Sequence, residues 1–265
     1  MAARCAFTGT MSPPPSAPLL PLGMAVAAGL VGSVAVMRRM TLASDAISHV
    51  ALPGVGVALL FHLNPVLGGL AALFAGTLLI WGLERKTHLP TEAIIGVVFS
   101  AALAIGSMLT PSEELLEALF GTARAPGRAE TLLGLAAAAL VILQLIRARS
   151  RLVITLVSAD LARTAGVNVP RTNLLFLLAF AVTVALGLRF LGVLLMGSLI
   201  IIPAATAKHL ARSLQSMQLI AVTIALLATL LGALAAPALQ VEAGPLTITT
   251  AAAIFVGSLA LRRPR

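Results

Sequence analysis

Charged side chains are scarce in this sequence: Asp, Glu, Lys and Arg make up only 10% of its 265 residues. A soluble domain carries about 25% charged residues, so this chain lacks the polar surface that a water-exposed fold needs. Hydrophobic residues reach 59%, and about 20 consecutive apolar residues cross a bilayer as a helix. The composition therefore predicts an integral membrane protein built mainly of bilayer-spanning helices.

Other absences narrow the function. The single cysteine, Cys5, excludes an internal disulfide and leaves the spans without the thiolate ligands of a monovalent copper site. No G-x-x-x-x-G-K-[ST] motif occurs, so the chain has no P-loop of its own, and H-E-x-x-H and G-x-S-x-G are missing too. The first apolar run lacks a signal-peptidase site. The residues therefore offer no motif for ATP hydrolysis, and we expect this chain to bind no cofactor.

Nine apolar runs divide the sequence. They cover residues 19–37, 46–63, 65–83, 93–110, 131–146, 172–188, 190–207, 214–236 and 245–261. We predict an all-α, polytopic transmembrane bundle of about eight or nine spans, with 190–207 the candidate for a re-entrant segment. The proline-rich residues 1–18 are expected to form an irregular tail, and residues 19–265 a single transmembrane domain.

The net charge of +9 comes from short basic clusters between the apolar runs, not from one continuous stripe. This distribution argues against nucleic-acid binding and is typical of cytoplasmic loops. Most of the 18 Lys and Arg residues fall in one set of alternate loops, whereas Glu113, Glu114 and Glu117 fall in the other set. The bias predicts that the N-terminus lies outside and that residues 147–171 and the C-terminus lie in the cytoplasm.

The first motif is Ser-Asp-Ala-Ile-Ser-His-Val-Ala-Leu-Pro-Gly at residues 44–54. Asp45 and His49 are spaced i,i+4, which places both on one face of a helix. A carboxylate oxygen and an imidazole nitrogen together suit a divalent transition metal, and Pro53 favours a broken helix of the kind found at permeation sites. Alternatively, Asp45 caps its helix near the interface and pairs with Arg38 or Arg39.

The second motif covers residues 157–167. Ser158 suits a helix N-cap and Gly166 suits the stop after its C-terminus, so a short helix is predicted within the longest cytoplasmic loop. Leu161 and Ala165 share one face of this helix, with the small Ala162 beside it. Such a face could dock into a groove on a soluble partner, or the helix could lie on the membrane surface.

Together these segments resemble the permease subunit of the metal-ion ABC transporter family, which imports zinc, manganese or iron in bacteria. The resemblance runs from about residue 24 to the C-terminus. It rests on Arg38-Arg39, residues 44–54, Ile95–Ser100, Leu119–Thr122, Asp160–Gly166, Leu199–Ala207 around Pro203, and Ala243–Pro245.

The resemblance implies a type II ABC importer fold in the bacterial inner membrane. It further implies two permease chains, expected to be identical, two ATPase subunits and an extracytoplasmic metal-binding protein. Asp45 and His49 would then lie on the metal pathway. The short cytoplasmic helix would couple to the ATPase through Asp160, Leu161, Ala162, Ala165 and Gly166.

Two rival functions follow from the residues themselves. An ion-coupled secondary metal carrier would use Asp45 as a proton site and would need no ATPase. An intramembrane hydrolase would need a second catalytic carboxylate or a serine elbow deep in a span, and the sequence offers neither. The residues leave zinc, manganese and ferrous iron open as the transported ion.

Overall fold

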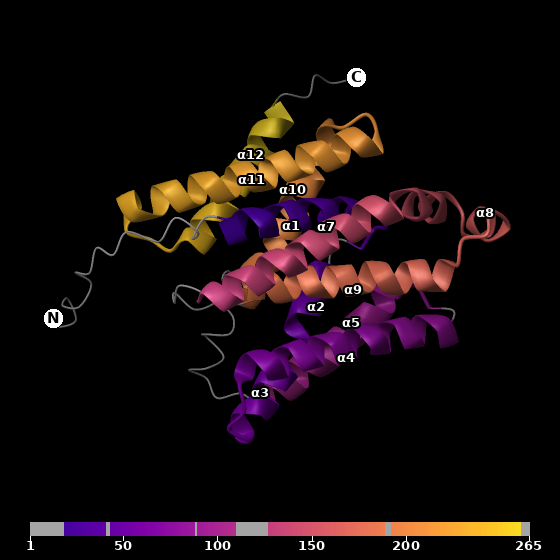
Figure 1. Cartoon of the computed structure of the whole chain (residues 1–265), viewed down its shortest axis with the longest axis horizontal. Helices are drawn as coiled ribbons and strands as arrows, with labels where there is room; N and C mark the ends of the chain where they lie inside the picture. The colour runs from indigo at the N-terminus through magenta and orange to yellow at the C-terminus, as the bar shows by residue number, and fades with distance from the viewer. Residues whose placement is uncertain (1–18, 41–42, 88, 110–126, 189–191, 261–265) are drawn as a thin grey trace.

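The computed structural model describes residues 19–40, 43–87, 89–109, 127–188 and 192–260 (Figure 1). The side chains of residues 43–45 and 192–194 lie outside the described part, as do the predicted tail at 1–18 and the segment Leu119–Thr122. The described ranges contain helices and no strand. The predicted all-α class is therefore confirmed.

The helices follow one another in a simple order. They are α1 (Leu19–Met37), α2 (Ala43–His49), α3 (Leu52–Leu60), α4 (Pro65–Lys86), α5 (Thr91–Leu109), α7 (Arg128–Val157), α8 (Ala159–Thr164), α9 (Val169–Leu188), α10 (Gly192–Leu210), α11 (Leu214–Leu239) and α12 (Ala243–Ala260). A helix satisfies its backbone hydrogen bonds internally, which is why apolar runs in a bilayer adopt it.

Each of the nine predicted apolar runs is mainly helical in the described ranges. Seven helices are long and apolar enough to cross a membrane by themselves: α1, α4, α5, α7, α9, α11 and α12. The other two runs give shorter apolar stretches: Ala46–Leu60, which covers the second half of α2 and all of α3, and Leu195–Leu210 of α10. The helical bundle is confirmed, and the number of spans, eight or nine, stays a prediction.

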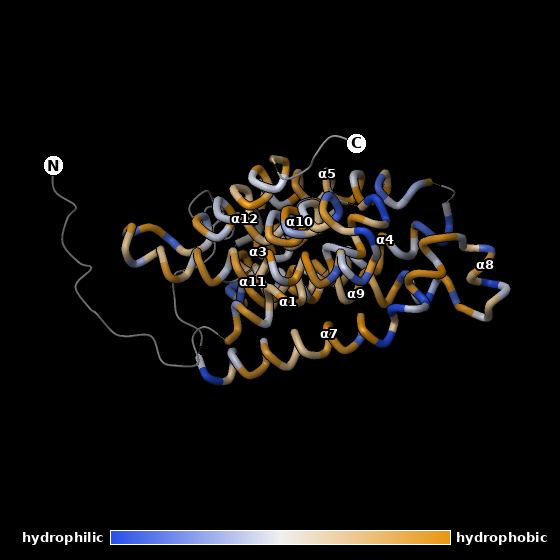
Figure 2. The backbone as a smooth tube through the Cα atoms, turned by 90° about the horizontal axis from the view of Figure 1, so that it is seen from above, coloured by the Kyte–Doolittle hydropathy of each residue, from blue (hydrophilic) through white to orange (hydrophobic). Residues whose placement is uncertain are grey.

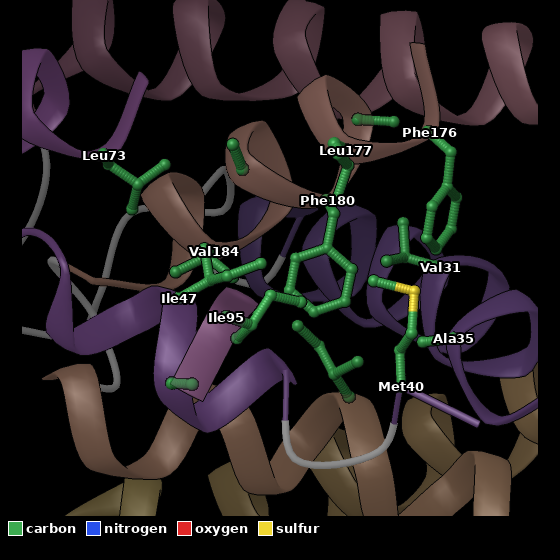
Figure 3. Packing of buried hydrophobic residues seen from close by; sticks show 14 of the residues in the cluster. Val31, Ala35, Met40, Ile47, Leu73, Ile95, Phe176, Leu177, Phe180 and Val184 are labelled. Carbon is green, nitrogen blue, oxygen red and sulfur yellow. The ribbon is translucent and has the colours of Figure 1, made fainter. Parts of the chain in front are cut away.

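Helix α1 lies at the centre of the bundle, where it packs against α7, α9, α10 and α11 (Figure 1). Its residues Val31 and Ala35 join one buried apolar cluster with Ile47 of α2 and Phe180 of α9. Figure 3 shows the Phe180 ring pointing into this cluster. Helices α3, α4 and α5 pack against one another beside this core, so the broken α2–α3 segment connects the centre of the bundle to that group.

Several helix ends meet at one end of the bundle, which we call the α8 end. Val36, near the end of α1, packs with Ala207 near the end of α10 and with Met217 near the start of α11. The indole Nε1 of Trp81, in the last turns of α4, donates a 3.0 Å hydrogen bond to the carbonyl of Pro170, in the first turn of α9. Hydrophilic residues gather towards this end (Figure 2).

The predicted loop at 147–171 is more helical than its composition suggests. Helix α7 continues through the basic stretch and ends at Val157, α8 follows at once, and α9 begins at Val169. The arginines from Arg147 to Arg151 are good helix formers, so the helix propagates beyond its apolar portion. The outer side of α7 is apolar: Leu132, Leu133 and Leu140 are 69%, 72% and 62% exposed, as expected for a lipid-facing helix.

Candidate functional site

The predicted break in the second apolar run is confirmed. Helix α2 ends at His49 and α3 begins at Leu52. A proline ring clashes with the carbonyl four residues before it, and four residues before Pro53 is His49. Across the break the backbone forms hydrogen bonds between residues three apart. The Val50 N–H donates to the Ile47 carbonyl (3.1 Å), and the Ala51 N–H donates to the Ser48 carbonyl (3.3 Å).

Gly54 explains why the second half of the broken helix can lie so close to its neighbour. A Cβ atom on Gly54 would collide with the carbonyl oxygen of Gly68 in α4, and a Cβ atom on Gly68 would collide with the carbonyl oxygen of Gly54. The two helices therefore cross in backbone contact, and only a pair of glycines permits this approach. The crossing fixes where α3 lies after the break.

His49 lies inside the bundle at about half its depth. Its side chain is 8% exposed, and its ring centroid is 5.5 Å from that of Phe99, close to the middle of α5. The neighbouring Val50 lies against Gly76, in the middle of α4. A broken helix that presents a ligand near the middle of a membrane protein is a recurrent arrangement at transport sites.

Asp45 belongs to α2, one turn before His49, so the predicted i,i+4 spacing on one helix is present. The side chain of Asp45 lies outside the described residues. Among the described side chains, no group of three or more His, Cys, Asp or Glu residues comes together. An oxygen and a nitrogen ligand from one helix turn would form a partial coordination shell for a divalent ion, as a site that must release its ion requires.

A second polar group lies at the α8 end, and we call it the helix-end cluster: Arg38, Glu84, Thr91 and Asn173. Arg38 Nη1 donates to Asn173 Oδ1 at 2.8 Å. Asn173 Nδ2 donates to Glu84 Oε1 at 3.1 Å, and the Thr91 hydroxyl donates to the same oxygen at 2.8 Å. The cluster thus ties the ends of α1, α4, α5 and α9 together.

Arg38, which is half-buried like the other three members of this cluster, follows the last residue of α1. Burial lowers the pKa of Arg38 to about 10, and the negative charge of Glu84 partly opposes this effect. The guanidinium therefore stays protonated at neutral pH. It also lies over the Phe176 ring, 4.7 Å from the centroid, a cation–π contact.

Sequence reasoning missed most of the helix-end cluster. It offered Arg38 or Arg39 as a partner for Asp45, whose side chain lies outside the described residues, and it did not foresee the hydrogen bond from Arg38 to Asn173. The available signal was polarity: Glu84 and Asn173 are rare hydrophilic residues within or beside apolar runs, where such residues are retained for a partner or a function.

The predicted short helix is confirmed as α8. The Ser158 hydroxyl accepts the Leu161 N–H at 3.3 Å, which caps the first turn. At the other end Gly166 has φ +75°. Its N–H bonds to the Arg163 carbonyl and the Val167 N–H to the Ala162 carbonyl, which is the Schellman pattern that ends helices. In Figures 1 and 2, α8 projects beyond the ends of α7 and α9.

The side chains of α8 differ in what they can contact. Leu161 is 58% exposed, and Ala165 is exposed beside it. Asp160 is also exposed and pairs with Arg163 at 2.9 Å. Ala162, in contrast, is fully buried within the chain, so it seats α8 on the bundle and is not available to a partner. Of the residues predicted to couple to a partner, Asp160, Leu161, Ala165 and Gly166 are therefore exposed, and only Ala162 is buried.

Comparison with known proteins relates the whole bundle to transporters. The model of the ABC 3 transport family matches residues 16–262. The high-affinity zinc uptake system membrane protein ZnuB of Haemophilus influenzae is 29% identical over 235 residues, which cover 86% of this chain and 90% of that protein. The manganese import system permease protein ScaB of Streptococcus parasanguinis is 28% identical over 239 residues, 89% and 85% of the two chains.

A solved structure gives the same relationship at the level of the fold. A chain in the structure of PsaBC from Streptococcus pneumoniae in complex with Fab superposes with a TM-score of 0.78 at 27% identity. The superposition covers 92% of this chain and 90% of that chain. The likeness therefore extends over almost the whole length of both proteins.

Proposed function

The chain belongs to the ABC 3 transport family, and from that premise we propose that it is the permease subunit of an ATP-driven importer of divalent transition-metal ions. It is a multi-pass protein of the bacterial inner membrane. The names of the relatives given above include zinc or manganese, and ferrous iron has similar ligand preferences. These three ions are the proposed substrates.

The observation that carries this proposal is the position of His49. The ring is buried beside Phe99 at mid-depth, at the end of a helix that Pro53 interrupts. A polar residue at this depth is costly in lipid and is retained where it serves a pathway. Asp45, one turn earlier, supplies the charge that compensates a divalent cation. We propose that the metal passes these two residues as it crosses the bundle.

The orientation of the chain in the membrane follows from its basic residues. Arg38, Arg85, Arg151 and Arg171 all belong to the helix ends that meet at the α8 end. Basic residues concentrate on the cytoplasmic side of membrane proteins. We therefore place α8 and the C-terminus in the cytoplasm, and the N-terminus outside.

This orientation gives α8 access to a cytoplasmic ATPase. Leu161 and Ala165 form an exposed apolar patch on a helix that projects beyond the bundle. We propose that this patch docks in a groove of an ATPase subunit. We assign ATP hydrolysis to that subunit because this chain has no P-loop. Movement of α8 would reach the pathway through α9, whose Asn173 is tied to α1 and α4 by the helix-end cluster.

The remaining partners follow from the same proposal. A second, identical permease chain would complete the pathway, and an extracytoplasmic metal-binding protein would deliver the ion. The residues from 19 to 265 would act as one transmembrane unit. Surrounding lipid would contact the exposed apolar side of α7.

Reconstitution tests the proposal. The chain is co-expressed with a candidate ABC ATPase subunit, purified, and placed in liposomes with a candidate metal-binding protein. We expect Zn²⁺ or Mn²⁺ to stimulate ATP hydrolysis and ATP to drive metal uptake. Uptake that needs no ATPase and collapses with the proton gradient would instead identify a secondary carrier and contradict the proposal.

A further inference from the structure

A cavity of about 440 Å³ opens where α7, the end of α8 and the first turns of α9 meet. Binding sites for small molecules usually have volumes of about 300–1,000 Å³, so the cavity is large enough for part of a ligand. It lies at the α8 end, and neither His49 nor Phe99 is among the residues that line it. It is therefore distinct from the surroundings of His49 described above, where the His49 ring contacts Phe99.

The part of the cavity that lies deeper in the bundle is apolar. Leu145 and Ala148 of α7 and Leu175 of α9 line it. The Gln144 amide donates a 2.7 Å hydrogen bond to the Leu175 carbonyl, which fixes the two helices at this depth. Leu175 is 43% exposed whereas Leu145 is only 3% exposed, so the deep part extends from the exposed side of α9 inward between the two helices.

The part of the cavity nearest the α8 end is basic. Arg151 of α7 and Arg171 of α9 both line it, and both are exposed. Asn168 lies with them and accepts the Arg171 backbone N–H at 3.0 Å through its side-chain oxygen. Among the described residues that line the cavity, none is acidic. The two positive charges therefore favour an anion.

We propose that this cavity binds an anionic phospholipid of the leaflet at the α8 end. The phosphate would lie between Arg151 and Arg171, and an acyl chain would follow the apolar part along Leu145 and Ala148. Basic pockets between transmembrane helices are a known way to recognise anionic headgroups, and a single molecule that is anionic at one end and apolar at the other matches both halves of the cavity.

The position of the cavity gives such a lipid a consequence for α8. Ala165 and Gly166, which end α8, form part of its lining. A bound lipid would therefore contact the turn that holds the short helix against α7 and α9. We expect the lipid to hold α8 in place. Only the assignment to the cytoplasmic leaflet depends on the orientation proposed above; binding of the lipid does not depend on metal transport.

The test uses the full chain in detergent, titrated with dioleoylphosphatidylglycerol or dioleoylphosphatidylcholine, with native mass spectrometry to count bound lipids and a thermal melt to give Tm. We expect phosphatidylglycerol to bind and to raise Tm more than phosphatidylcholine does. The double variant Arg151→Gln/Arg171→Gln should bind phosphatidylglycerol about 30-fold more weakly, since each basic residue near an anionic headgroup contributes roughly fivefold.

A matched control removes the same charge from the same part of α7. Arg147 and Arg149 do not line the cavity, so Arg147→Gln/Arg149→Gln should bind phosphatidylglycerol as the wild type does. A second variant, Ala148→Leu, keeps every charge and narrows the apolar part, and it should also weaken binding.

Three results would overturn the proposal. An equal loss of binding in the control would mean diffuse charge attraction and no defined site. A rise in Tm with inorganic phosphate alone would identify a phosphate site. Loss of bound phosphatidylglycerol when the ATPase subunit is added would identify the cavity as a protein contact.

Discussion

Arg38 and Asn173 are 135 residues apart in the sequence, yet the guanidinium of one donates a 2.8 Å hydrogen bond to the amide oxygen of the other. The same amide donates to Glu84, so Asn173 lies between a cation and an anion and forms a hydrogen bond with each. This bridge holds the first turns of α9 against α1 and α4. Since α9 follows α8 directly, the bridge lies between the proposed docking helix and the interior of the bundle.

Replacing Asn173 by leucine should therefore destabilise the fold. A hydrogen bond to a charged group contributes about 1.5–3 kcal/mol, and Asn173→Leu removes one to Arg38 and one to Glu84. We expect a loss of at least about 2 kcal/mol in the free energy of unfolding, measured by denaturant unfolding in detergent. Thr155→Val is the control, because its contact with Arg38 is 3.5 Å long and should contribute little. Equal stability of Asn173→Leu and the wild type would contradict the bridging role.

The glycine crossing of α3 and α4 makes a second stability prediction. In Gly68→Ala the new methyl group would collide with the Gly54 carbonyl and lie 2.6 Å from the Ala58 Cβ atom. Overpacking of this kind costs about 1–3 kcal/mol, and we expect a matching drop in unfolding free energy. Gly82→Ala is the control within the same helix, since a Cβ atom there meets nothing within 4 Å. Similar stabilities of the two variants would mean that the crossing tolerates a wider separation.

The local structure around both candidate sites could be predicted from the sequence. Ser158 and Gly166 mark the ends of α8 because capping depends only on neighbouring residues. Pro53 marks the break after His49 for the same reason. In each case a few adjacent residues determine the backbone, so no knowledge of the rest of the fold is needed.

The contacts between distant segments could not be predicted in this way. The pairing of Arg38 with Asn173 depends on how α1, α4 and α9 pack, and no pattern in the sequence specifies it. The burial of Ala162 could not be predicted either, because it depends on how α8 packs against the rest of the chain. Helix α7 extends to Val157 because helix propensity continues where the apolar run stops; hydropathy alone predicted a loop there.

The orientation of the bundle can be measured by labelling. Arg163 in α8 has a 67% exposed side chain, and Glu242, between α11 and α12, is exposed at the opposite end. In a Cys5→Ser background, an impermeant maleimide should label Glu242→Cys in intact cells and Arg163→Cys only in inside-out vesicles. The reverse pattern would invert the proposed orientation.

The docking surface on α8 predicts a difference between adjacent residues. Leu161→Glu places a charge on the exposed apolar patch of Leu161 and Ala165. We therefore expect the ATPase no longer to co-purify with the variant, while membrane insertion and protein yield stay normal. Ala162→Glu should instead lower the yield of folded protein, because position 162 is fully buried. Leu239→Glu, on an exposed position in the last turn of α11, is the control for added surface charge. Co-purification of Leu161→Glu at the wild-type level would contradict docking through this face.

The metal pathway gives the sharpest prediction, because Asp45 and His49 can be altered with little change of shape. Asp45→Asn removes the charge and keeps the volume, and His49→Leu removes the nitrogen and keeps the bulk. If both residues serve one partial coordination shell, each variant should reduce metal uptake severely, and the double variant should be little worse than either single variant. Assembly with the ATPase should survive in all three, since α8 is untouched.

A purely structural role gives different results for the same variants. If Asp45 only stabilises the start of α2, Asp45→Asn should lower protein yield, and His49→Leu should leave uptake unchanged, because leucine suits a site beside Phe99. Measurement of uptake kinetics for yield-matched protein separates the two roles. Wild-type kinetics in His49→Leu would remove His49 from the pathway even though it is buried at mid-depth, since a ligand that can be lost without effect does not coordinate the ion during transport.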